Sequence, residues 1–89
     1  MEFKSEENRF YLAEENHTLI AEVTFLIHDD ILVINHTFVN PEYRGQQLGQ
    51  QLIKKVVEKA TAENKKIEPL CSFAQREFEK NESYQPLRK

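Results

Sequence analysis

Glycine is scarce in this sequence, which has only 2 glycines among 89 residues where average usage would give about six. Both of them, Gly45 and Gly49, lie within one five-residue stretch. Glycine is used where a chain needs a left-handed conformation or an unobstructed backbone. Segment 44–49 is therefore the first place at which we expect a functional loop.

Cysteine and long hydrophobic runs are also rare. Cys71 is the only cysteine, which excludes an internal disulfide and a cysteine-based metal cluster. The histidines match none of the common zinc spacings; they are His17, His28 and His36. The longest apolar run, residues 31–34, is far shorter than the ~20 residues of a membrane span, and the N-terminus lacks a signal-peptide pattern. We therefore expect a cytoplasmic protein that binds neither a metal nor a membrane.

The residues that are present suit one small folded domain. Hydrophobic residues make up 39% of the chain and charged residues 30%, which is enough apolar bulk for one modest core. Because independent domains usually need about 50 residues or more, we expect residues 1–89 to form a single domain.

Charge is unevenly distributed along the chain. Residues 1–39 hold eight acidic and two basic side chains, whereas residues 40–89 hold seven and ten. This difference suits a cationic ligand for the first half and an anionic one for the second, although a mixed solvated surface explains it equally well. The sequence has no dense Lys/Arg stripe of the kind that would indicate nucleic acid binding.

The first half of the chain has the composition of β-strands. Residues 8–13 predict a short strand, and β-branched and apolar residues predict longer strands at 18–27 and 31–39. The turn-forming residues between the last two strands make them a hairpin. Pro41 then ends the pairing because it has no N–H to donate.

The second half changes to a helical period. Apolar residues recur at helical spacing at Leu48, Leu52, Ile53, Val56, Val57 and Ala60. Asn64 and the two lysines after it mark the end of this helix. A short strand is predicted at 67–71, then a helix at 73–80 capped by Ser72, and an irregular tail at 83–89.

These elements predict an α/β (α+β) fold. The strand at 31–39, the long helix and the strand at 67–71 form a β-α-β unit, which should cross over right-handed and make its two strands parallel. We expect a mixed, mainly antiparallel sheet of about four strands, with one parallel pair and two helices.

Segment 44–49 lies between a strand and the first turn of a helix. The N–H groups of a first turn lack internal acceptors and carry a partial positive charge, which favours a phosphate there. Gly45 can open the turn, Gly49 lets a ligand or a neighbouring strand approach, and Arg44 adds a forked cation. The spacing fits neither a Walker nor a Rossmann loop. The plainer alternative is a helix start with a surface arginine.

Residues 37–49, together with the helix behind them, resemble the GNAT superfamily of N-acetyltransferases. Family members carry a Pro-x-x-Arg-Gly approach and a Q/R-x-x-G-x-G/A loop whose amides hold the pyrophosphate of acetyl-coenzyme A. Arg44, Leu48 and Gly49 match this loop. Gln47 stands at the usual central glycine, and we expect it in right-handed helical geometry, which modifies affinity without abolishing it.

The resemblance extends to a second motif. Residues 69–73 (P-L-C-S-F) match the Pro-Leu-Cys-x-Phe segment of a compact, single-domain bacterial branch of GNAT-like proteins. The resemblance implies a GNAT-like fold and binding of acetyl-coenzyme A (acetyl-CoA), with the pantetheine arm on the backbone of the first parallel strand. The implied cofactor-binding residues are Phe38, Val39, Arg44, Gly45, Gln46, Gln47, Leu48, Gly49 and Phe73. The chain is too short for the helices that shape the acceptor site elsewhere in the family.

Two side chains are candidate catalytic residues. Cys71 ends a strand just before a helix, where it could protonate the leaving thiolate or form an acyl-enzyme; its alternative is an inert core thiol. His36 could act as a base or orient Cys71, and its alternative is a sheet-face histidine. Glu68 and Tyr84 are weaker candidates. Strand alternation places Glu68 on the face opposite Cys71.

Two functions follow from these residues. The leading hypothesis is an N-acyltransferase that moves an acetyl group from acetyl-CoA to an amine acceptor, either a small molecule or a protein amine. The alternative is a non-catalytic acyl-CoA-binding or sensing module that acts through a protein partner. A third possibility is a structural domain without a ligand.

Overall fold

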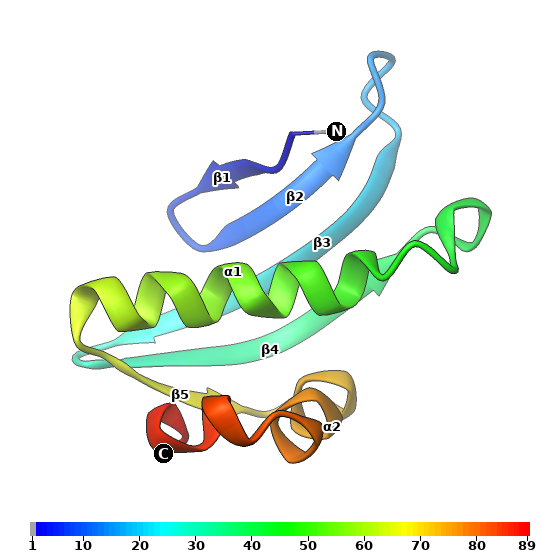
Figure 1. Cartoon of the computed structure of the whole chain (residues 1–89). Coiled ribbons are helices and arrows are strands. Elements are labelled where there is room, and N and C mark those ends of the chain that lie inside the picture. Colours follow the sequence, from blue (N-terminus) through cyan, green and yellow to red (C-terminus); the bar gives the residue numbers. More distant parts are fainter. Residues whose placement is uncertain (1) are drawn as a thin grey trace.

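A five-stranded sheet in the order β1-β2-β3-β4-β5 forms the scaffold (Figure 1). The computed structural model describes residues 2–89. The strands are β1 (Lys4–Glu6), β2 (Arg9–Ala13), β3 (Leu19–His28), β4 (Ile31–Val39) and β5 (Lys66–Pro69). Strands β1 to β4 pair antiparallel, whereas β4 and β5 pair parallel. The expected mixed sheet with one β-α-β unit is confirmed.

Strand β1 was not predicted. All three of its residues are exposed, so they show no alternation of apolar and polar side chains. The strand forms because its backbone pairs with β2.

The long helix α1 (Leu48–Glu63) lies across one face of the sheet (Figure 1). All six apolar positions of the predicted helical pattern are buried. Asn64 ends the helix in a left-handed conformation, and its N–H donates to the carbonyls of Ala60 and Thr61. The core lies between α1 and the sheet; its largest fully buried side chains are Phe25, Phe78, Leu32, Ile34, Leu52, Ile53, Ile67, Val23 and Val56.

The second helix, α2 (Ser72–Lys80), lies beside β5 at the sheet edge opposite β1 (Figure 1). Its N-cap is Cys71 and not Ser72, so that prediction was wrong. Cys71 is the last extended residue, and its sulfur accepts the hydrogen bond that we had expected the serine hydroxyl to accept. The predicted irregular tail is also wrong, because residues Glu82–Leu87 form a 3₁₀ helix, η2.

An extra residue in β4 changes which side chains face α1. Asn35 is the extra residue, and the flanking strand pairs are Phe25 with Ile34 and Thr24 with His36. A bulge of this kind shifts the alternation of side chains by one position. Before it the even-numbered residues of β4 face α1, and after it Thr37 and Val39 do, opposite Val23 and Ala21.

Strand β5 covers only the first part of β4. Their pairing ends at Ile34 with Pro69, two residues before the predicted end of the strand. The N–H groups of Leu70 and Cys71 then donate to the Ile34 carbonyl, at 2.9 and 3.3 Å, and the chain turns into α2. Within residues 2–89, positions 35–39 of β4 therefore have no strand on that side.

Candidate functional site

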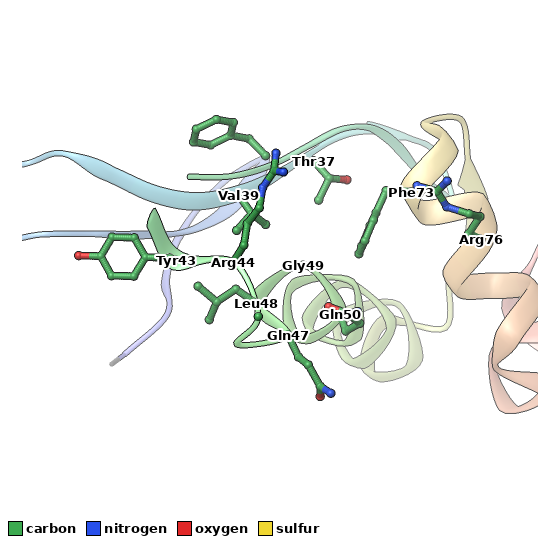
Figure 2. A pocket seen from close by; sticks show the side chains of 12 residues that line it. Thr37, Val39, Tyr43, Arg44, Gln47, Leu48, Gly49, Gln50, Phe73 and Arg76 are labelled. Atoms are coloured by element: carbon green, nitrogen blue, oxygen red, sulfur yellow. The ribbon is translucent and has the colours of Figure 1, made fainter. Parts of the chain in front are cut away.

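A cavity of about 600 Å³ lies at this uncovered end of β4. Its volume is within the range of small-molecule sites. The lining comes from β4, the loop before α1, the first turn of α1 and the start of α2 (Figure 2): Thr37, Phe38, Val39, Tyr43, Arg44, Gly45, Gln47, Leu48, Gly49, Gln50, Phe73 and Arg76. The two motifs singled out in the sequence thus meet at one place.

Most of the predicted cofactor-binding residues line this cavity. Gln46 is the exception; its carbonyl accepts from the side chain of Gln51 at 3.2 Å.

The segment before the loop is a short 3₁₀ helix, η1 (Pro41–Tyr43), tied to the sheet at both ends. The Asn40 side chain accepts from the Glu42 N–H at 3.0 Å and donates to the Leu19 carbonyl at 3.2 Å. The Tyr43 hydroxyl donates to a carboxylate oxygen of Glu14 at 2.6 Å. This hydrogen bond and the nearby negative charge raise the pKa of Tyr43 above its ordinary value. The loop therefore starts from a fixed position.

The loop itself uses two left-handed residues. Gly45 has φ +88° and Gln47 has φ +58° with ψ +32°. The expected right-handed geometry at Gln47 is therefore wrong. Gln47 is the N-cap of α1 and therefore lies outside the right-handed helix; its backbone is left-handed where an N-cap is more often extended, and its carbonyl accepts from the Gln51 N–H at 3.1 Å. A glycine at this place would meet no steric cost.

The first turn of α1 presents donors at the cavity. The side chain of Gln47 does not cap the helix, and the first intrahelical bond is made by the N–H of Gln51. The N–H groups of Leu48, Gly49 and Gln50 precede that bond, so the helix itself gives them no acceptor. All three residues line the cavity. Together with the helix dipole they form an anion-binding geometry.

Gly49 allows α2 to approach α1. A Cβ atom at this position would lie 2.7 Å from Cζ of Phe73. The close neighbour of this glycine is thus the ring of Phe73, where the sequence had suggested a ligand or a strand. A Cβ atom at Gly45 would meet nothing within 4 Å. The two glycines therefore serve different purposes, one close packing and the other a positive φ.

Cys71 is partly buried beside the cavity. Its Sγ lies 3.1 Å from Oγ1 of Thr37 and accepts from the N–H of Ala74 at 3.4 Å. Thr37 and Phe73 both line the cavity. The thiol is thus held at the start of α2, between the end of β5 and the uncovered part of β4.

His36 is not brought to Cys71. Neighbouring residues of a strand point to opposite faces, and it is Thr37 that contacts the sulfur. The Nε2 atom of His36 lies 3.4 Å from Oε2 of Glu22, and the other carboxylate oxygen of Glu22, Oε1, accepts from Arg9 at 2.9 Å. The His36 side chain is 52% exposed on this opposite face.

The two weaker candidates also lie outside the cavity lining. Glu68 pairs in register with Val33, on the face opposite the buried Ile67. Tyr84 packs on Phe78 with ring centroids 5.4 Å apart, and burial raises the pKa of its phenol.

Four cavity residues were missed by sequence reasoning: Thr37, Tyr43, Gln50 and Arg76. Arg76 follows Phe73 by three positions, and this spacing on a helix puts two side chains on one side. That signal was available in the sequence. Thr37 had none, because it faces α1 only as a result of the bulge at Asn35.

Residues 2–89 contain neither a candidate metal cluster nor a candidate membrane-spanning helix. No cluster of three or more His, Cys, Asp or Glu side chains that could hold a metal ion occurs in this range. None of its helices is long and apolar enough to cross a membrane.

The model of the GCN5-related N-acetyltransferase family matches residues 9–87. The chain belongs to this family. A GCN5-like protein from Staphylococcus aureus, solved by NMR, is similar to this GNAT chain at 41% identity, with a TM-score of 0.80 over 99% of this chain and 87% of the other. No protein of curated function matches the sequence.

More distant structures share the fold. The ribosomal-protein-S18-alanine N-acetyltransferase of Escherichia coli is 17% identical, with a TM-score of 0.67 over 86% of this chain and 53% of its own. A Clostridium acetobutylicum protein solved with acetyl-CoA is 20% identical, with a TM-score of 0.58 over 81% and 54%. The GNAT chain thus spans about half the length of these two relatives.

Proposed function

We propose that this GNAT chain binds acetyl-CoA in the cavity and transfers its acetyl group to an amine acceptor. The observation that carries the proposal is the first turn of α1, whose N–H groups face a cavity that Arg44 also lines. The pyrophosphate fits these donors because oriented amides and a guanidinium both favour phosphate. The acceptor is an amine of unspecified class.

The uncovered edge of β4 suits the pantetheine arm. The N–H of Asn40 donates to the Ile20 carbonyl, toward β3. Because N–H directions alternate along a strand, those of Thr37 and Val39 point away from β3, to the uncovered side. Pantetheine carries amide groups that can pair with such an edge. In this proposal the backbone of Val39 pairs with the pantetheine arm, as predicted. The backbone of Thr37 also pairs with it, in place of the backbone of Phe38.

Cys71 is the side chain to which we assign the chemistry. The acceptor amine, as free base, attacks the thioester carbonyl; the tetrahedral intermediate then expels the coenzyme thiolate, which takes a proton from the Cys71 thiol. The Cys71 thiolate in turn takes the proton that the acylated nitrogen releases, which restores the thiol. In a second route the Cys71 thiolate attacks first, coenzyme A leaves as the thiol, and the amine then takes the acetyl group from sulfur. His36 has no contact with Cys71, so neither route uses it.

Backbone amide shifts under titration test the binding. We expect acetyl-CoA to shift the amides of residues 45–50 and of Thr37 and Val39, with little change in β1. An absence of shifts in residues 45–50 at millimolar ligand would overturn the proposal.

A second experiment separates the two chemical routes. Intact mass after incubation with acetyl-CoA, in the wild type and in Cys71→Ser, shows whether the sulfur is acetylated. A control with acetyl-CoA and denatured protein measures chemical acylation. Acetyl-Cys71 that disappears when an amine is added supports the acyl-enzyme route, and transfer without it supports direct attack.

The alternative function, a non-catalytic acyl-CoA-binding module, is favoured by one observation. Within residues 2–89 the Cys71 sulfur has hydrogen-bond contacts only with the Thr37 hydroxyl and the Ala74 N–H, and no basic side chain is paired with it. Release of coenzyme A in the presence of a panel of amines discriminates the two functions. Release by the wild type that does not exceed the protein-free background would support the binding module, whereas equal release above background in wild type and Cys71→Ala would contradict the catalytic role of Cys71.

A further inference from the structure

The cavity contains two arginines and no acidic side chain. Arg44 comes from the loop before α1, and Arg76 comes from α2. None of the twelve lining residues is Asp or Glu, although the chain has 15 of them and a net charge of −3. The local charge of the cavity is therefore opposite to that of the whole molecule.

Neither arginine is neutralised by a carboxylate within residues 2–89. Arg9, on the sheet, shows the contrast, because it donates to Glu6 at 2.6 Å and to Glu22 at 2.9 Å. The acidic residues of α2 are Glu77, which is buried and lies 3.7 Å from the ammonium of Lys80, and Glu79. Within residues 2–89 neither of them forms an ion pair with Arg76. Two guanidinium groups that face one cavity without counterions favour an anionic ligand.

The two arginines approach the cavity from different sides. Figure 2 shows Arg44 on one side of the Phe73 ring and Arg76 on the other. Phe73 is in turn held against Gly49 in the first turn of α1. An anion at the start of α1 thus meets donors from the helix and Arg44, and an extended polyanion can reach Arg76 across the cavity.

We propose that Arg76 is a phosphate-binding residue that raises the affinity of this chain for ligands that carry the phosphates of coenzyme A. This inference rests on the proposed function and adds a recognition residue to it. A guanidinium binds phosphate through two parallel hydrogen bonds, which an amide side chain cannot reproduce and an ammonium reproduces only as a point charge. Coenzyme A offers such groups in its pyrophosphate and in its 3′-phosphate.

The experiment compares three ligands and four proteins. Acetyl-CoA, 3′-dephospho-acetyl-CoA and S-acetylpantetheine are titrated into the wild type, Arg76→Gln, Arg76→Lys and Lys54→Gln, with dissociation constants taken from amide shifts. Lys54→Gln is the matched control, because Lys54 is an exposed cation of α1 outside the cavity lining. Thermal unfolding of each variant checks that the fold is retained.

We expect Arg76→Gln to weaken the binding of acetyl-CoA about fivefold to tenfold, which is the loss expected for a partly exposed charge-assisted hydrogen bond. The dissociation constant of Arg76→Lys should fall between those of Arg76→Gln and the wild type. That of Lys54→Gln should stay within about twofold of the wild type. S-acetylpantetheine has no phosphate group, so we expect it to bind all four proteins with the same affinity. If the loss persists with the dephospho ligand, Arg76 contacts the pyrophosphate; if the loss disappears, it contacts the 3′-phosphate.

Two results would overturn the inference. One is an Arg76→Gln variant that binds acetyl-CoA as tightly as Lys54→Gln does. The other is an equal loss with S-acetylpantetheine, which would mean that Arg76 acts by packing. Both differ from a failure of the proposed function itself, in which the wild type does not bind acetyl-CoA at all.

Discussion

Gln47 is the residue at which this chain departs from its family's loop pattern, and the structure explains what the departure costs. Its left-handed backbone is a conformation that an L-residue with a side chain disfavours by about 1–2 kcal/mol. Gln47 is the N-cap of α1, so this strain lies at the residue that joins the loop to the helix. The side chain also stands at the cavity, where a glycine would leave the backbone open.

Replacement of Gln47 by glycine tests both consequences. We expect Gln47→Gly to keep the free energy of unfolding within about 0.3 kcal/mol of the wild type, because relief of strain offsets the added flexibility of the unfolded chain. Acetyl-CoA should bind more tightly. Gln46→Gly is the control, since its backbone is not left-handed, and it should lose about 1 kcal/mol. Chemical denaturation measures both variants, and equal losses would contradict the strain argument.

At the scale of elements, the loop before α1 depends on a contact between distant segments. The Tyr43 hydroxyl donates to Glu14, which lies between β2 and β3. Tyr43→Phe removes this bond without changing the ring, so we expect weaker acetyl-CoA binding from a less ordered loop. The variant Glu14→Gln, which can still accept the bond, should retain more of the affinity.

The same contact predicts a dependence of stability on pH. The pKa of Tyr43 is raised above its ordinary value of 10.0, chiefly by its hydrogen bond to Glu14. The contribution of the bond is therefore fully present below pH 10 and is lost as the pH rises through the higher pKa of the folded state. The stability difference between the wild type and Tyr43→Phe should be constant from pH 6 to 9 and shrink above pH 10. A difference that is unchanged at pH 11 would contradict this.

The contact between α1 and α2 is the second element-scale feature. Gly49→Ala places a methyl group against the Phe73 ring, and we expect it to cost about 1–3 kcal/mol of stability. The double variant with Phe73→Leu should recover part of that loss, giving a measurable coupling energy. Gly45→Ala is the matched control: it is strained by its φ of +88° but has no close neighbour, so Phe73→Leu should not rescue it. Equal coupling at both glycines would refute the packing role.

For the whole molecule, the features that follow from local pattern could be predicted and those that follow from tertiary pairing could not. The helical period identified α1, and the position of the loop predicted residues that line the cavity. Strand β1 has no buried residue and exists only through its pairing with β2. The bulge at Asn35 lies inside a continuous β-rich stretch, so nothing in that stretch marked the change of face that separates His36 from Cys71.

Because Thr37 and His36 are adjacent in β4 but lie on opposite faces of the sheet, variants of the two residues show which face affects Cys71. Thr37→Val keeps the shape of the side chain but removes the hydroxyl 3.1 Å from the Cys71 sulfur, whereas His36→Ala alters only the opposite face. A hydroxyl that donates to sulfur stabilises the thiolate over the thiol. We therefore expect Thr37→Val to slow alkylation of Cys71 by iodoacetamide about threefold at pH 8, and His36→Ala to leave both that rate and acetyl-CoA affinity within about twofold of the wild type.

Both rates are followed by intact mass, with Cys71→Ser as the blank that shows the background of the method. If His36→Ala slows alkylation as much as Thr37→Val does, the imidazole affects the reactivity of the Cys71 thiol from the opposite face of the sheet, which would contradict the prediction. If only Thr37→Val responds, the two faces of the sheet act separately. The face that α1 covers then holds acetyl-CoA and the thiol, while the opposite face carries the Arg9–Glu22–His36 network.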